Sequence, residues 1–111
     1  NQHRSFAKIA DANFFLAESW MQQYEFDKAY AQFRTFLTRY RNHRHTPRAT
    51  FRMGEAAYRS EKHQVALRLI EEFIRKYPQH ELNQFALPYL GQIRNLRSEP
   101  QLASHRYHQS S

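Results

Sequence analysis

The sequence predicts an all-α protein built from repeated pairs of antiparallel helices. Residues that favour strands are scarce, because the 111 residues include one Val, four Ile and four Thr. Residues that favour helices are plentiful, with twelve Ala. Small and apolar side chains also recur with a period of 37 residues, as Ala12, Ala49 and Ala86 illustrate. A repeat of this length is typical of a solenoid of stacked units.

The first repeat is expected over residues 10–46, after an N-terminal flank of residues 1–9. Small and apolar residues at helical spacing predict its first helix over 10–23. A second helix is expected over 27–41, and Asp27 is suited to cap its N-terminus. The two helices should form one antiparallel pair.

The second repeat, residues 47–83, shows the same order of signals. Pro47 suits the first turn of a helix expected over 47–60, where its missing N–H costs little. A second helix is expected over 63–77 and should end before Pro78, which cannot continue it.

The third repeat, residues 84–111, is expected to be partial. Its first helix is predicted over 84–97, and a short sixth helix near 100–108 should form the C-terminal tail. The chain begins with Asn and shows no signal peptide, so it is expected to be a segment of a longer protein.

The three units share a register in which a small residue holds the eighth position of each unit. Gly54 should lie opposite Ala66, because only small side chains let the two helix axes of a pair approach closely. The residues of this pattern are Ala17, Gly54 and Gly91, followed by Ala66, Ile70 and Pro78. The pattern resembles the tetratricopeptide repeat over about residues 10 to 107. The resemblance implies a short right-handed solenoid of helix pairs that serves as a protein-interaction scaffold.

The repeat length of 37 and the string from Ala66 to Pro78 are similar to a bacterial subclass of these repeats. That subclass includes the lipoproteins of the outer-membrane barrel-assembly machinery and the periplasmic coordinator of the Tol-Pal system. This resemblance implies a location in the periplasm or cell envelope, whereas the residues alone leave the compartment open. No transmembrane segment is expected, because no run of about 18 apolar residues occurs.

The residues favour binding over catalysis. The chain has no Cys, and the pair His43 and His45 has no third ligand nearby, so we expect solvated histidines and no metal site or cofactor. The pair Glu71 and Glu72 lies in a solenoid that offers a groove rather than a closed pocket, and no nucleophile elbow or phosphate loop occurs. We therefore do not expect an enzyme.

Carried over from the tetratricopeptide family, the register places one set of side chains on the concave wall. Arg48, Arg52 and Arg59 should share one helix face and bind carboxylates of an acidic protein or peptide, with aromatic rings beside them. The predicted partner-binding residues are Phe14, Phe15, Arg48, Phe51, Arg52, Glu55, Tyr58, Arg59, Phe85 and Tyr89.

The net charge of +7 leaves an alternative open. Thirteen of the 17 basic residues are Arg, and such a balance favours acidic protein surfaces, nucleic acid or anionic lipid. Nucleic-acid or anionic-polymer binding through the same Arg-rich helix face is the second hypothesis, and steep salt dependence would distinguish it. A purely structural spacer is the third. We also expect self-association through exposed terminal helices, at Leu90, Ile93 and Leu102.

Overall fold

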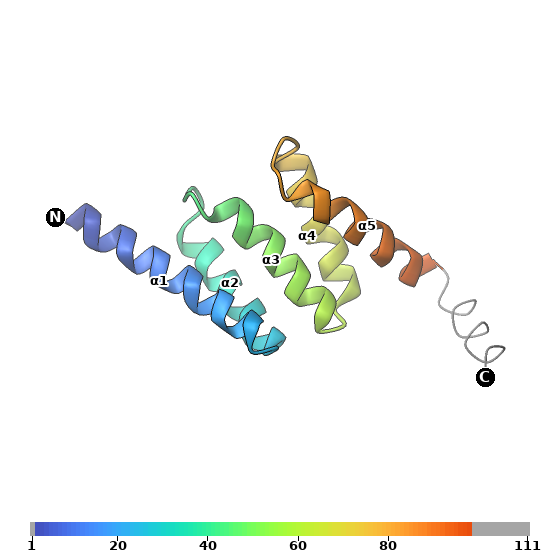
Figure 1. The fold of residues 1–111 in the computed structure, drawn as a ribbon, viewed down its shortest axis with the longest axis horizontal. Helices are drawn as coiled ribbons and strands as arrows, with labels where there is room; N and C mark the ends of the chain where they lie inside the picture. Colours follow the sequence, from blue (N-terminus) through green and yellow to red (C-terminus); the bar gives the residue numbers. More distant parts are fainter. Residues whose placement is uncertain (1, 99–111) are drawn as a thin grey trace.

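The computed structural model describes the backbone of residues 2–98 and the side chains of residues 8–95. Five helices make up this part of the chain: α1 (Gln2–Gln22), α2 (Phe26–Arg39), α3 (Thr46–Arg59), α4 (His63–Lys76) and α5 (Asn83–Ser98). They form two layers (Figure 1). The first layer consists of α1, α3 and α5, which run parallel to one another, and the second layer consists of α2 and α4 behind them. Each helix packs on the next one along the chain. The all-α prediction is confirmed.

The boundaries of α2 to α5 lie within two residues of the predicted ones. The first helix instead begins eight residues before the predicted start at residue 10 and runs through most of the N-terminal flank. The reason is local, because residues 2–9 contain no Gly or Pro that would end a helix. The predicted sixth helix lies outside the described residues. Within residues 2–98, no helix is both long and apolar enough to cross a membrane.

The turn inside each helix pair is built in the same way in both complete repeats. Tyr24 and Glu61, 37 residues apart, have φ angles of 62° and 64°. The next residue closes the helix end in each case, with Glu25 N–H donating to the Trp20 carbonyl at 2.9 Å and Lys62 N–H to the Ala57 carbonyl at 2.8 Å. This is a Schellman motif whose left-handed position usually holds Gly. Asp27 does not cap α2, which begins one residue earlier and has no side-chain cap.

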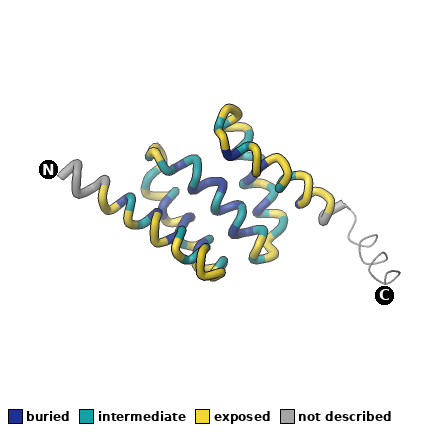
Figure 2. Tube along the Cα trace, viewed as in Figure 1, coloured by how far each residue is buried: buried dark blue, intermediate teal, exposed yellow. Residues whose placement is uncertain are grey.

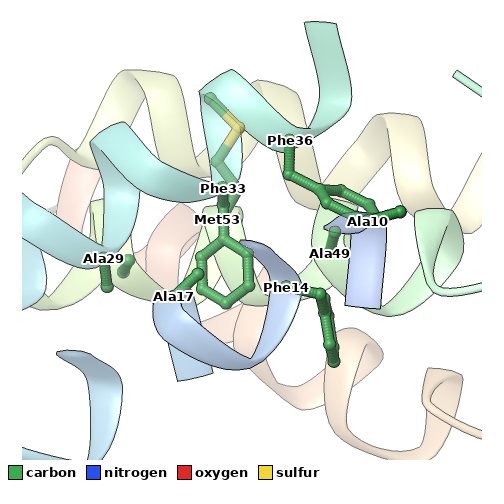
Figure 3. Close-up of a cluster of buried hydrophobic side chains, with 9 residues drawn as sticks. Ala10, Phe14, Ala17, Ala29, Phe33, Phe36, Ala49 and Met53 are labelled. Carbon is green, nitrogen blue, oxygen red and sulfur yellow. The ribbon is translucent and has the colours of Figure 1, made fainter. Parts of the chain in front are cut away.

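The core lies between the two layers, as the buried segments in Figure 2 show. In the first repeat, Phe14 of α1 packs edge-on against Phe33 of α2, with ring centroids 6.0 Å apart, and contacts Phe36 at 5.8 Å. Fully buried alanines, among them Ala17 and Ala49, surround these rings (Figure 3). Since their side chains are small, the helices can approach closely enough to exclude water.

The close approach of α3 and α4 at Gly54 is confirmed, although the nearest neighbour differs. A Cβ atom on Gly54 would lie 2.7 Å from Ile70 Cδ1, so Ile70 rather than Ala66 stands opposite this glycine. At Gly91, the equivalent position of α5, no described atom lies within 4 Å of such a Cβ. Ile93 is fully buried, which corrects its predicted exposure at a terminal face, and Leu102 lies outside the described residues.

Candidate partner-binding face

The helices α1, α3 and α5 share what we call the inner face, the face that the repeat register assigns to a partner. Phe15 and Phe85 are the most exposed of the predicted aromatic residues, at 56% and 52%. Arg59 is exposed as well, whereas the remaining polar and aromatic residues of the predicted set are half-buried. These half-buried residues are Arg48, Arg52, Glu55, Tyr58 and Tyr89.

Phe14 and Phe51 were expected to offer apolar contact to a partner, and this expectation is wrong. Both rings are 2% exposed and lie in the core. Phe51 packs against Phe73 of α4 at 5.7 Å and against Tyr89 of α5 at 5.9 Å. Phe14 and Phe51 therefore lie at the edge of the inner face, and each ring packs against a helix of the second layer.

Arg52 lies at the centre of the inner face, between two carboxylates. Its Nη1 donates a hydrogen bond to Glu55 Oε1 at 2.8 Å. Its Nε forms an ion pair with Glu18 Oε1 of α1 at 3.1 Å, without the angle of a hydrogen bond. Burial opposes the charge, but the hydrogen bond to Glu55 and the charge of Glu18 outweigh it and raise the pKa of Arg52. The guanidinium is therefore charged and already engaged, so Arg52 is not a free anion-binding group.

Glu55 continues this network to α5. Its Oε2 accepts a hydrogen bond from the Tyr89 hydroxyl at 2.8 Å. Burial, together with the charge of Glu55 and this hydrogen bond, raises the pKa of Tyr89 to about 12. Glu18, Arg52, Glu55 and Tyr89 thus connect the three inner helices across the repeat boundaries, and we call them the inner network.

Two hollows flank the inner network. The one between α3 and α5 has a volume of about 450 Å³ and is lined by Tyr58, Arg59, Phe85, Pro88, Tyr89 and Gln92. The other, of about 210 Å³, lies between α1 and α3 and is lined by Glu18, Met21, Gln22, Tyr24, Phe26, Arg52, Glu55 and Arg59. Arg59 lines both hollows, with its guanidinium 5.1 Å from the centre of the Phe26 ring.

Pro88 was not among the predicted site residues. The 37-residue register could have identified it, because two predicted site residues occupy the equivalent positions of the first two repeats. Pro88 occupies the same register position as Phe14 and Phe51. Unlike them it is exposed, and it forms part of the wall of the larger hollow.

A charge pair between a first-layer helix and the loop that follows its repeat occurs in both repeats, with the signs exchanged. Asp11 accepts a hydrogen bond from Arg44 Nη2 at 2.7 Å. In the next repeat the equivalent positions hold Arg48 and Glu81, which form an ion pair at 3.8 Å. Arg48 is therefore only loosely paired, and its side chain is 37% exposed.

His43 and His45, in the loop between α2 and α3, are packed rather than solvated, which corrects the expectation from sequence. His45 stacks on Phe14 with ring centroids 4.3 Å apart and 11° between the planes. Burial lowers the pKa of His45, although the nearby carboxylate of Asp11 acts in the opposite direction. His43 packs against Phe36 at 5.6 Å. In the part of the chain with described side chains, no group of three or more His, Cys, Asp or Glu residues could hold a metal ion.

These features define the class of the protein as a helical repeat protein of the tetratricopeptide type, whose first-layer helices carry hollows and charged groups. The family model of YfiO, described as an outer membrane lipoprotein, matches residues 8–110, and the chain belongs to this family. The match confirms the resemblance to barrel-assembly lipoproteins inferred from the repeat. No curated protein matched the chain.

Proposed function

We propose that this protein is a non-enzymatic interaction scaffold that holds a peptide or a partner subunit on its inner face, within an assembly on the periplasmic side of the cell envelope. The observation that supports this most directly is the aromatic hollow between α3 and α5. Membership in a family of outer membrane lipoproteins supports the location.

The aromatic hollow suits an apolar side chain. Tyr58 and Tyr89 meet edge to face with centroids 5.4 Å apart, and Phe85 leaves half of its surface open. Because the Tyr89 hydroxyl is bonded to Glu55, its ring is held in a fixed orientation. A fixed aromatic surface binds with little loss of conformational entropy, and such residues are common at binding hot spots.

The acidic character proposed for the partner depends on Arg48 and Arg59 rather than on Arg52. Arg59 is exposed at the rim of the aromatic hollow, and Arg48 could exchange its loose contact with Glu81 for a carboxylate of the partner. A polyanion is less suited to this face, because Glu18 and Glu55 lie along it and would repel phosphates.

The test is fluorescence polarisation with short labelled peptides that alternate aromatic and acidic residues, alongside peptides in which Lys replaces each acid. We expect the acidic peptides to bind and Arg59→Glu to weaken them roughly tenfold, because losing an exposed ion pair costs up to about 1 kcal/mol and the reversed charge adds a repulsion of similar size. Arg75→Glu, a charge reversal on the second layer, should leave binding unchanged. Equal loss in both variants would show that binding follows overall charge and would refute the groove.

A further inference from the structure

The side of the second layer that faces away from the first layer carries five arginines without acidic partners: Arg34 and Arg39 on α2, Arg41 in the loop after α2, and Arg68 and Arg75 on α4. Within residues 8–95, none of the five forms an ion pair with a described carboxylate, and all five are exposed. On the first-layer side, Arg44, Arg48 and Arg52 each pair with a carboxylate, and Arg59, which has no such pair among the described residues, lies over the Phe26 ring. We call Arg34, Arg39, Arg41, Arg68 and Arg75 the outer arginine face.

The position of the two arginines of α4 follows from helix geometry. Arg68 and Arg75 are seven residues apart, close to two turns, and therefore project from the same side of α4. The buried residues Ala66, Ile70 and Phe73 occupy the opposite side. Because α2 and α4 form the second layer of the fold (Figure 1), both helices turn these outer sides away from the inner face.

The carboxylates of the second layer do not neutralise this charge. Asp27 accepts a hydrogen bond from Lys62 Nζ at 2.9 Å, and Glu71 accepts one from Arg94 Nη2 at 2.9 Å. Glu72 lies 3.9 Å from Lys76. Since each of these acids already has a basic neighbour, the outer arginine face retains its positive charge.

Two hollows on this side combine guanidinium groups with other binding features. The first, of about 410 Å³, lies along α2 and is lined by Tyr30, Ala31, Arg34, Thr35, Thr38 and Arg39. The second, of about 350 Å³, lies between α2 and α4 and is lined by Leu37, Arg41, Thr46, Thr50, Leu69, Glu72, Lys76 and Tyr77. Arginine is well suited to phosphate because its planar group can form two parallel hydrogen bonds.

We propose that the outer arginine face binds the anionic phospholipid headgroups of a membrane surface, with headgroup phosphates held by the arginines. The charge is spread over two neighbouring helices rather than gathered into a channel. The rings that line the hollows, Tyr30 and Tyr77, are half-buried and offer no open platform on which nucleic-acid bases could stack. An outer membrane lipoprotein is moreover held beside phospholipid.

The experiment is co-sedimentation of the 111-residue chain with phosphatidylglycerol-containing vesicles and with vesicles of phosphatidylcholine alone. We expect binding only to the anionic vesicles and a loss of roughly fivefold per outer arginine removed, or about 25-fold for Arg34→Gln with Arg75→Gln. The matched control, Lys8→Gln with Arg48→Gln, removes the same charge from the first layer and should change binding less than threefold. Circular dichroism checks that both variants remain helical.

Three outcomes would overturn the proposal. Equal losses in the two double variants would show attraction by net charge alone. Equal binding to neutral vesicles would exclude recognition of anionic headgroups. Tighter binding to a single-stranded DNA oligonucleotide than to anionic vesicles at the same ionic strength, lost in the same variant, would assign the face to nucleic acid.

Discussion

Replacing Gly54 by Ala tests the packing between α3 and α4 directly, because two opposing effects can be separated. Ala is favoured over Gly inside a helix by roughly 0.5–1 kcal/mol. The new Cβ would lie 2.7 Å from Ile70 Cδ1 and 3.1 Å from Ile70 Cγ1, and Ile70 is fully buried, so it has little room to move. Overpacking of this kind costs about 1–3 kcal/mol. We therefore expect Gly54→Ala to lower the free energy of unfolding by about 1 kcal/mol, and Gly54→Leu by more.

Gly91 provides the matched control, since a Cβ atom added to it would have no described atom within 4 Å. Gly91→Ala should gain the helical preference without the contact and stabilise the protein by roughly 0.5–1 kcal/mol. Urea unfolding followed by circular dichroism measures both variants. If Gly54→Ala were as stabilising as Gly91→Ala, the close approach of α3 and α4 would be refuted.

Three further predictions concern stability. Arg52→Gln should lower the free energy of unfolding by about 1–3 kcal/mol, because it leaves half-buried carboxylates without their charged partner; an unchanged urea midpoint would contradict this. Glu61→Gly should raise the thermal midpoint, because Gly removes roughly 1 kcal/mol of left-handed strain; a lower midpoint would contradict it. Since the pKa of Tyr89 is raised to about 12, the folded state keeps a proton that the unfolded state loses near pH 10, so stability should fall between about pH 10 and 12. Tyr89→Phe should lose this part of the pH dependence in urea titrations, and an unaltered profile would contradict the assignment.

The sequence pattern predicts the helix order and much of the core because both follow from local periodicity. Phe33, Phe36 and Phe73 hold apolar positions at helical spacing, and all three are fully buried. The same pattern could not separate Phe14, which is buried, from its neighbour Phe15, which is 56% exposed. Adjacent helical residues differ by about 100° in direction, so the boundary between core and groove passes between them, and its position depends on the tilt of α1 against α2.

The pairing of the arginines could not be predicted for a different reason. Arg52 reaches Glu18, which lies 34 residues earlier, only because α1 and α3 stack side by side in the first layer. Helical spacing places a side chain on a face but does not determine which neighbouring helix supplies its partner. The sequence therefore placed Arg52 on this face, but it could not show that neighbouring carboxylates already hold its guanidinium.

The distribution of charge between the two layers leads to a distinction that experiments can use. On the inner face Arg52 is neutralised by carboxylates, so an acidic peptide is attracted there by Arg48 and Arg59 alone, beside the apolar surface of the aromatic hollow. The outer arginine face has no such neutralisation among the described residues, so the binding of an anionic ligand there should depend strongly on ionic strength. If both proposals are correct, added salt should weaken vesicle binding more steeply than peptide binding, because five arginines contact the vesicle and two contact the peptide. Parallel salt dependence of the two activities would contradict this difference in charge between the layers.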